Sequence, residues 1–140
     1  MKSSKFWIAV VAGGVVANVL DFIVQGKVFT DMYYSKMPEH FNMNANPAFY
    51  IFGDFVAVFV FAWVYDKVYA SFGGGMKGGM TYGIYAGVLI NFPTWIFAHL
   101  MMQGVSYGMS WMMTIYGVIW YTIVGSIVGQ MYMKGDAAKA

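Results

Sequence analysis

Four long apolar segments constrain this chain more than any other feature of its sequence. They run from about residue 6 to 26, from 48 to 65, from 81 to 102 and from 109 to 133. A helix that crosses the hydrocarbon core of a bilayer needs about 20 mostly apolar residues, and each segment is close to that length. Because the apolar runs are continuous rather than alternating, they argue against β-strands. We therefore predict an all-α integral membrane protein, a four-helix bundle, with residues 1–140 forming one transmembrane domain.

The composition excludes several other classes of protein. Hydrophobic residues make up 60% of the chain and charged residues only 10%, against roughly 25% charged residues in a soluble domain. So few charges cannot cover a soluble surface of this size, and a disordered chain would be far more polar. The chain has no cysteine, which excludes disulfides and thiolate metal sites. Its net charge of +2 is too small to indicate a nucleic-acid partner.

Residues that end helices fall between the apolar segments. Asn46 and Pro47 suit the start of the second helix, with Asn46 as its cap and Pro47 in its first turn. The glycine-rich segment 73–79 predicts a flexible connection between the second and third spans. The connection at 104–108 is so short that the third and fourth spans should be antiparallel neighbours.

Lysine residues are distributed unevenly between the two predicted faces of the membrane. The face that holds the N-terminus carries six of them, which are Lys2, Lys5, Lys67, Lys77, Lys134 and Lys139. The opposite face carries only Lys27 and Lys36. Lysine-rich loops remain on the cytoplasmic side of membrane proteins, so we expect both termini in the cytoplasm. The outer side then carries one long loop, at about 28–46, and a very short second loop.

The spans share a short sequence pattern. Residues 14–18 (GVVAN) of the first span align with residues 87–91 (GVLIN) of the third, and 52–53 (FG) with 116–117 (YG). If this pattern reflects a duplication, the chain consists of two helical hairpins related by a parallel repeat. Chance similarity between apolar segments is the alternative.

Polar residues interrupt the apolar spans and form a candidate site inside the membrane. Asn18, Asp21 and Gln25 are three and four residues apart, so they share one face of the first helix. Because a charge that faces lipid costs several kcal/mol, this face should point into the bundle. The candidate polar site consists of Asp21, Asn18, Gln25, Asp54, Asn91, Thr94 and His99.

Two interpretations of these polar residues remain open. One is a polar cavity, open to the outer side, that holds a cation, a proton relay or a small polar ligand, with Asp21 carrying the charge. The other is a set of buried hydrogen bonds that hold the helices together, each contributing about 0.6–2 kcal/mol. Pro93 removes one hydrogen-bond donor from the third helix, so we also expect a kink beside Asn91 and Thr94.

Small residues spaced four apart mark surfaces where helix backbones can approach closely. The predicted helix-packing residues are Gly13, Ala17, Gly83, Gly87, Gly125 and Gly129. Packing inside the four-helix bundle is the simplest use of these surfaces. Assembly of a homo-oligomer is the alternative use, and the strip with Tyr121, Gly125 and Gly129 on the fourth span is its best candidate.

The predicted outer loop contains thioether and imidazole groups, which favour Cu(I). The candidate metal ligands are Met32, Met37, His40 and Met43. Their spacing is irregular, and methionine is frequent throughout the chain, with 13 residues. The alternative is that these methionines fill gaps or suit a loop that lies on the membrane.

No motif in the chain indicates catalysis. The sequence contains no phosphate-binding glycine loop with its lysine, no HExxH motif and no paired-carboxylate motif at a recognisable spacing. No Ser–His–acid set is evident, so we predict that the protein is not an enzyme. The sequence does not identify a cofactor or exclude one.

Asn18 and Asp21 in the first span are followed by Gly26 and by the aromatic pair Tyr33-Tyr34 of the outer loop. This pattern resembles small uncharacterised bacterial four-span integral membrane proteins. The resemblance covers the overall layout of the spans. It implies a multi-pass protein of the bacterial cytoplasmic (inner) membrane, and it implies no activity and no catalytic residue.

These observations favour an accessory or assembly subunit of a larger membrane complex, without catalytic activity of its own. The expected partners are the lipid bilayer and either other membrane subunits or further copies of the chain. A small carrier or channel for a cation, a proton or a small polar solute is the first alternative, and it would use Asp21. Copper handling by the outer Met/His loop is the second alternative.

Overall fold

The computed structural model describes residues 3–132, and helices are the only regular elements within that range. These are α1 (Ser4–Ile23), the π-helical turn η1 (Val24–Phe29), α2 (Thr30–Met32), the 3-10 turn η2 (Tyr34–Lys36), α3 (Pro47–Val68), the 3-10 turn η3 (Tyr69–Phe72), α4 (Gly75–Met101) and α5 (Tyr107–Gln130). Four helical segments, built on α1, α3, α4 and α5, are long and apolar enough to cross a membrane. The prediction of an all-α chain with four candidate membrane spans is therefore confirmed.

Polar side chains begin three of the four long helices, because the first N–H groups of a helix have no partner within it. At the start of α3, Asn46 accepts a hydrogen bond from the backbone N–H of Ala48 (3.0 Å). Pro47 occupies the first turn of this helix, so the predicted cap is confirmed. Ser3 and Ser106 cap α1 and α5 in the same way.

The first helix extends further than the sequence predicts. It continues past residue 26 through η1 to Met32, so the segment that leads to α3 covers residues 33–46 rather than 28–46. The hydroxyl of Thr30 donates to the carbonyl oxygen of Gln25 (2.9 Å) across the π-helical turn. A π-helical turn widens a helix without ending it, so the first helix continues through η1 into α2.

The third helix begins at Gly75 rather than near residue 81. The glycine-rich segment is therefore a turn only at its start, where Gly73 and Gly74 adopt positive φ angles of 79° and 63°. Gly79 is helical and packs on the backbone of α5. The prediction of a flexible connection across the whole segment is wrong, because its second half is needed for helix packing.

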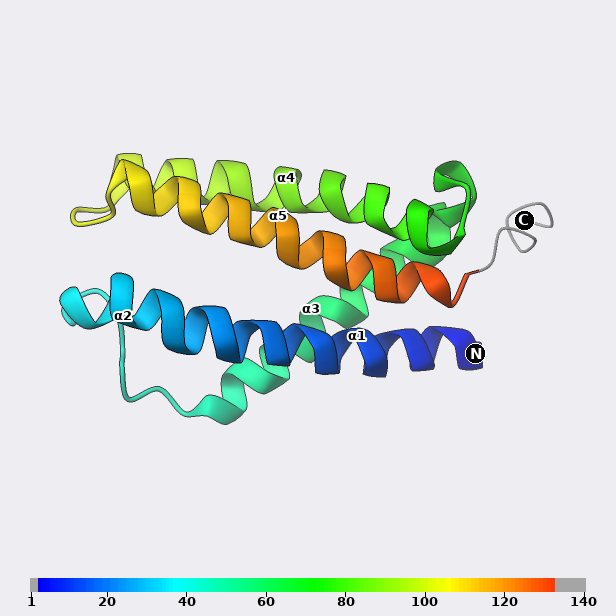
Figure 1. The fold of residues 1–140 in the computed structure, drawn as a ribbon, viewed down its shortest axis with the longest axis horizontal. Coiled ribbons are helices and arrows are strands. Elements are labelled where there is room, and N and C mark those ends of the chain that lie inside the picture. The colour runs from blue at the N-terminus through cyan, green and yellow to red at the C-terminus, as the bar shows by residue number, and fades with distance from the viewer. Residues whose placement is uncertain (1–2, 133–140) are drawn as a thin grey trace.

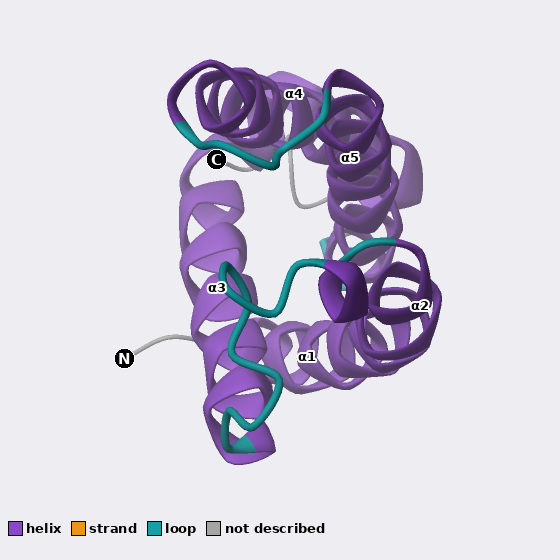
Figure 2. Cartoon of the chain, turned by 90° about the vertical axis from the view of Figure 1, so that its left-hand side faces the viewer, coloured by secondary structure: helices purple, strands orange, loops and turns teal. Residues whose placement is uncertain are grey.

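The four long helices form two hairpins that pack against each other (Figure 1). α4 and α5 lie side by side and run in opposite directions, whereas α3 crosses α1 at a steep angle (Figure 1). α1 packs against both α3 and α5. In the end view, the α4–α5 pair faces α1, and α3 lies along one side of the bundle (Figure 2). The first helices of the two hairpins, α1 and α4, run in the same direction (Figure 1). The hairpins differ in that α3 crosses α1 at a steep angle, whereas α5 lies beside α4.

Glycine residues form the contact between α4 and α5. Gly79 and Gly83 of α4 are buried. A Cβ atom at these positions would overlap backbone atoms of Gly125 and Tyr121 of α5, respectively. Gly87, one turn further along α4, lies similarly close to α5. Backbones that approach this closely gain van der Waals contact along the seam.

This seam uses the strip of small residues on the fourth span. Gly125 and Gly129 are buried and lie against glycine backbone of α4. The strip is therefore covered within the chain itself. It offers no free surface to a second copy, contrary to the interpretation of this strip as an oligomer interface.

The apolar core lies between α1, α3 and α5. Gly13 and Ala17 of α1 are buried, and Gly13 allows α1 to approach Val58 of α3 and both Val124 and Val128 of α5. These three valines are 0% exposed. Most large side chains of α4, by contrast, point outward, which suits a helix whose outer face contacts lipid.

α4 continues through Pro93 as one helix (Figure 1). Proline has no N–H group for the carbonyl four residues earlier, which belongs to Leu89. On the same turn, the hydroxyl of Thr94 donates to the carbonyl oxygen of Ile90 (2.5 Å). α4 is therefore continuous at Pro93, and the kink expected beside Asn91 and Thr94 stays a prediction.

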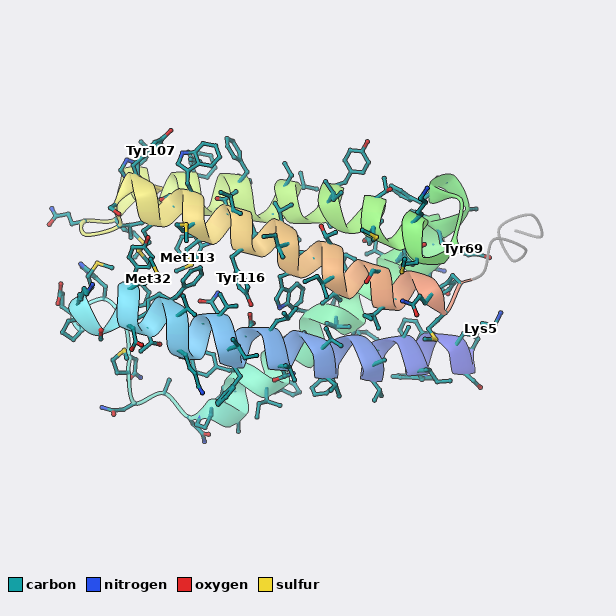
Figure 3. All side chains as sticks on the ribbon, in the orientation of Figure 1. Lys5, Met32, Tyr69, Tyr107, Met113 and Tyr116 are labelled. Atoms are coloured by element: carbon teal, nitrogen blue, oxygen red, sulfur yellow. The ribbon has the colours of Figure 1, made fainter. Side chains whose placement is uncertain are left out.

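The two ends of the bundle carry different side chains (Figure 3). Lys5 and Tyr69 lie at one end, and Met32 and Tyr107 lie at the other. Tyr116 lies between these ends (Figure 3). If the long axis of the bundle crosses a membrane, Tyr116 lies at the depth of the hydrocarbon core.

Candidate intramembrane binding site

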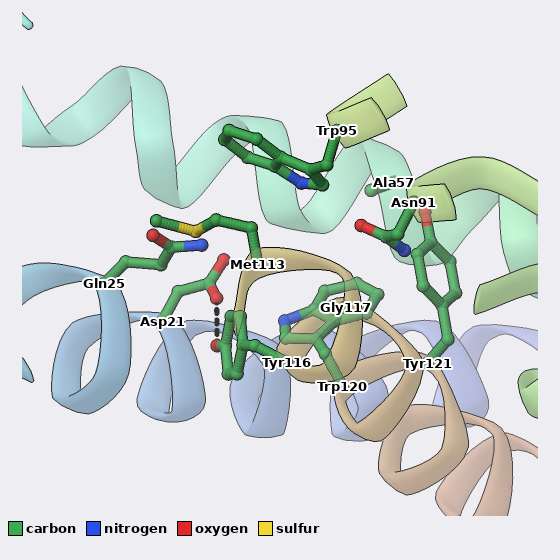
Figure 4. A pocket seen from close by; sticks show the side chains of 10 residues that line it. All are labelled: Asp21, Gln25, Ala57, Asn91, Trp95, Met113, Tyr116, Gly117, Trp120 and Tyr121. Carbon is green, nitrogen blue, oxygen red and sulfur yellow. Dashed lines mark hydrogen bonds between the residues drawn. The ribbon is translucent and has the colours of Figure 1, made fainter. Parts of the chain in front are cut away.

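A cavity of about 170 Å³ lies beside Tyr116. All four long helices contribute to its walls, and η1 adds one further side chain. The lining side chains are Asp21, Gln25, Ala57, Asn91, Trp95, Met113, Tyr116, Gly117, Trp120 and Tyr121 (Figure 4). The volume is similar to that of a cavity of about 150 Å³ that holds benzene, so a small molecule fits.

Polar groups lie at opposite ends of this cavity (Figure 4). Asp21 and Gln25 lie at one end, and Asn91 and Tyr121 lie at the other. Three residues of the sequence-predicted polar site therefore line one cavity, although they are distant in sequence. Two adjacent turns of the first helix supply one end, and the third helix supplies the other.

Asp21 is the acidic group of the cavity. The hydroxyl of Tyr116 on α5 donates a hydrogen bond to Asp21 Oδ1. Asp54 of α3 is close enough to interact electrostatically with Asp21, although it does not line the cavity. The hydrogen bond from Tyr116 connects Asp21 of α1 to α5.

The side chain of Gln25 lies about one turn beyond Asp21 on the same face. Its Oε1 atom accepts a hydrogen bond from the hydroxyl of Tyr34. The same hydroxyl lies 3.6 Å from the sulfur atom of Met113 on α5. Tyr34 belongs to η2, so the segment after the first helix folds back onto Gln25 and onto Met113 of α5.

Asn91 lies on the side of α4 that faces α5. Its Nδ2 atom donates to the carbonyl oxygen of Gly87 (3.0 Å). The hydroxyl of Thr114 lies 3.5 Å from the carbonyl oxygen of Asn91 and links the two helices. A Cβ atom on Gly117 would overlap the side chain of Asn91. Gly117 therefore provides the space that Asn91 occupies.

Aromatic rings form the walls between the polar ends. Trp95 of α4 and Trp120 of α5 lie on opposite sides of the cavity, with Tyr116 and Tyr121 beside Trp120 (Figure 4). Trp120 is 6% exposed, and its Nε1 atom has no hydrogen-bond partner among the described residues. Buried donors normally have a partner, so Trp120 leaves an N–H group that a bound molecule can use.

Asn18, Thr94 and His99 do not line the cavity. Asn18 Nδ2 lies 3.5 Å from the carbonyl oxygen of Ile51 on α3. Thr94 is exposed, and its hydroxyl binds its own helix. His99 Nδ1 lies 2.8 Å from the carbonyl oxygen of Val105, in the connection between α4 and α5. The predicted polar site therefore separates into a cavity and several structural contacts.

Asn18 and Asn91, which the sequence pattern aligns, make the same local hydrogen bond. Asn18 Nδ2 donates to the carbonyl oxygen of Gly14 (2.9 Å), and Asn91 Nδ2 donates to that of Gly87 (3.0 Å). Their surroundings differ, because Asn18 faces α3 and Asn91 lines the cavity. The shared pattern therefore produces the same local geometry in both hairpins, while only the second asparagine contributes to the site.

The Met and His residues of the predicted outer loop are only partly gathered. Met37 and His40 both lie close to Gly104, in the connection between α4 and α5. Met32 and Met43 are 41% and 47% exposed. Within residues 3–132, no group of three His, Asp or Glu side chains is close enough to hold a metal ion. The copper site stays a prediction.

The sequence prediction missed the aromatic half of the site. Tyr116, Trp120 and Tyr121 come from the fourth span, and Trp95 comes from the third. Trp and Tyr are usually enriched at the ends of membrane spans, whereas Tyr116 and Trp120 occur near the middle of α5. Aromatic side chains with polar tips in the middle of a span are the signal that could have identified them.

Comparison with protein-family models, with curated proteins and with solved structures found no match to this chain. Function is therefore inferred from the chemistry of the cavity. This chemistry combines one carboxyl, two side-chain amides and aromatic walls inside an apolar bundle.

Proposed function

We propose that this protein is a small carrier or channel that binds a small cation at Asp21, inside the membrane. The observation that supports the proposal is the cavity beside Asp21, with its acidic group, amides and aromatic walls. Ionisable groups inside membrane helices are costly, and they commonly mark the pathways of ions or substrates. Hydrogen bonds that only hold helices together would not need an open space beside Asp21.

The ionisation of Asp21 determines the charge of this site. Its carboxyl attracts a cation only in the ionised form, and a cation bound beside it stabilises that form, because opposite charges attract. Protons and the cation therefore compete, and we expect binding of the cation to weaken as the pH falls.

The orientation that we propose places both termini in the cytoplasm of a bacterial cell and the bundle in its inner membrane. The supporting observation is the distribution of lysines in residues 3–132. One end of the bundle holds Lys5, Lys67 and Lys77, and the other holds Lys27 and Lys36. An excess of lysine favours the cytoplasmic side. The lysines at positions 2, 134 and 139 lie outside the described residues.

The test is cation binding and flux by the purified protein and its Asp21→Asn variant. The protein in detergent is titrated with Na⁺, K⁺ and methylated ammonium ions of increasing size, and proteoliposomes are assayed for uptake of the same ions. We expect at least one of these cations to bind and to cross the bilayer. Asp21→Asn should weaken the binding at least about tenfold, which corresponds to about 1.4 kcal/mol, because it removes the charge at the site.

Asp31→Asn is the matched control for this test. Asp31 is exposed in α2 and lies outside the cavity, so this variant removes the same charge and should leave binding unchanged. Melting curves of the three proteins establish whether each variant folds. If no cation distinguishes Asp21→Asn from Asp31→Asn, the proposed function is wrong.

An accessory subunit of a larger membrane complex is the second candidate. It is favoured by the start of α3, which extends away from the bundle (Figures 1 and 2). Phe49, Tyr50 and Phe52 there are 76%, 63% and 67% exposed, and this apolar surface suits either lipid or another subunit. The role predicts that Asp21→Asn is tolerated. It also predicts that a partner remains bound after gentle extraction from the native membrane, which native mass spectrometry measures.

A further inference from the structure

We infer that the ligand of this cavity is a small alkylammonium ion rather than an inorganic cation. The inference rests on the proposed function, because it names the substrate class of the same site. It follows from the position of the Asp21 carboxyl at the end of a cavity with aromatic walls (Figure 4). The aromatic side chains of these walls are Trp95, Tyr116, Trp120 and Tyr121.

The aromatic walls suit a cation that carries methyl or other alkyl groups. The face of a Trp or Tyr ring attracts an ammonium ion within about 6 Å, and the attraction grows where water is excluded. Trp120 and Tyr116 are only 6% and 9% exposed, so these rings are largely shielded from solvent. A carboxylate at one end and rings along the sides match an ion whose charge is surrounded by apolar groups.

The oxygen atoms that an inorganic cation needs are few in this cavity. Calcium and magnesium ions take about six to eight oxygen ligands, and potassium channels use rings of backbone carbonyls. Helical backbone forms these walls, and its carbonyls bind within the helices. Apart from tyrosine hydroxyls, the side-chain oxygens come from Asp21, Gln25 and Asn91. Asp21 already accepts from Tyr116, and Gln25 accepts from Tyr34.

The size of the cavity agrees with the same class of ligand. Its volume of about 170 Å³ is slightly larger than a cavity that holds benzene, which has about six heavy atoms. A methylated ammonium ion of about five to eight heavy atoms fills such a space, whereas a bare metal ion leaves most of it empty.

The experiment compares tetramethylammonium with a neutral molecule of the same size and with inorganic cations. The purified full-length protein in detergent is titrated calorimetrically with tetramethylammonium, tert-butanol, Na⁺ and K⁺. tert-Butanol has the same number of heavy atoms as tetramethylammonium and carries no charge. We expect tetramethylammonium to bind at least about tenfold more tightly than each of the others.

Two substitutions of Trp95 separate the effect of an aromatic ring from that of apolar bulk. Trp95→Phe keeps an aromatic face on the wall, whereas Trp95→Leu keeps a large apolar side chain without a ring. Trp95 is only partly buried, so we expect both variants to fold. Trp95→Phe should change tetramethylammonium binding by less than about threefold, and Trp95→Leu should weaken it about tenfold. Trp7→Leu is the control, because Trp7 is 52% exposed and lies outside the cavity.

Several outcomes would overturn the inference. Equal binding of tetramethylammonium and tert-butanol would do so, as would equal effects of Trp95→Phe and Trp95→Leu. Binding of Na⁺ or K⁺ that depends on Asp21 but not on Trp95 would overturn it and leave the proposed function intact. Absence of any binding that depends on Asp21 would overturn both. If Trp95→Leu fails to fold, Tyr121→Phe and Tyr121→Leu repeat the comparison on the neighbouring wall.

Discussion

Tyrosine hydroxyls donate hydrogen bonds to two of the carboxyl groups of this bundle. Tyr116 donates to Asp21 beside the cavity, and Tyr132 donates to Asp66 (2.9 Å), near the last turn of α3. A tyrosine presents an apolar ring to its surroundings and a single donor to its partner. It can therefore satisfy an acidic side chain among apolar helices without bringing in a second charge.

Tyr132 gives a prediction that depends on pH. Burial raises the pKa of its hydroxyl above the ordinary value, and the hydrogen bond to Asp66 adds to the effect. The folded protein therefore favours the protonated form. This contribution to the free energy of unfolding is complete below about pH 10, where a tyrosine in the unfolded chain begins to titrate, and it decreases as the pH rises further. Tyr132→Phe should lower the free energy of unfolding by about 1–2 kcal/mol at neutral pH. Above pH 10, the free energy of unfolding of this variant should fall less steeply with pH than that of the wild type.

The measurement is unfolding in mixed micelles, followed by circular dichroism at several pH values. Tyr85→Phe is the matched control, because Tyr85 is 65% exposed on α4 and its hydroxyl has no comparable burial. An equal loss of stability in both variants, or the same pH dependence in Tyr132→Phe and the wild type, would show that the hydrogen bond to Asp66 is unimportant.

At the level of helices, the two hairpins are packed by different means. α4 and α5 meet through glycine on both helices, so their backbones are in contact. α1 and α3 meet where Gly13 of α1 receives the side chain of Val58. Backbone contact leaves no room for adjustment, whereas a contact with a side chain can shift slightly. The α4–α5 seam should therefore be the part of the fold that tolerates substitution least.

Gly79→Ala tests this expectation against Gly53→Ala. A Cβ atom on Gly79 would overlap the carbonyl oxygen of Gly125 and would lie 2.8 Å from Gly129 Cα, whereas nothing lies within 4 Å of a Cβ atom on Gly53. Gly79→Ala should lower the free energy of unfolding by about 1–3 kcal/mol. Gly53→Ala should raise it by up to about 1 kcal/mol, because alanine favours the helix.

Unfolding by sodium dodecyl sulfate in mixed micelles measures both variants. The opposite signs are the important result, because both substitutions add the same methyl group to a helix. A neutral effect of Gly79→Ala would mean that α4 and α5 are not in backbone contact in the membrane.

For the molecule as a whole, the site lies where the two hairpins meet. Asp21 comes from the first hairpin and Asn91 from the second, and α5 lies between α1 and α4. Movement of one hairpin against the other would therefore change the shape of the cavity. Such an arrangement suits a carrier, in which one half of the bundle rocks against the other around a central site.

The orientation of the whole molecule can be measured with single cysteines, because the chain has none of its own. Ser35 and Ser71 are exposed at opposite ends of the bundle, in η2 and η3. In intact cells, a membrane-impermeant maleimide should label Ser35→Cys and should label Ser71→Cys only after permeabilisation. The lysine distribution is the physical reason. The reverse pattern of labelling would place both termini outside the cell.

Part of the candidate site could be predicted from the sequence. The spacing of Asp21 and Gln25 predicts that they share a face, and the cost of placing a charge in lipid predicts that this face points inward. The sequence could not show that Asn91 joins them while Thr94 and His99 do not, because this depends on how each helix is rotated in the bundle. It also could not show the role of Trp120, since a tryptophan that lines a cavity cannot be distinguished from one in the apolar core until its neighbours are known.

The sequence by itself determined that the chain forms four long apolar helices, where α3 begins, and which polar residues are costly to expose to lipid. These properties depend on residues close together in the chain, through helical periodicity, capping and apolar length. Only the tertiary structure decided that the glycines of α4 and α5 face each other. It also decided that Tyr116 binds Asp21 and that aromatic rings enclose the space beside it. The physical reason is that these contacts depend on the crossing and rotation of whole helices, which are set by packing over many residues at once.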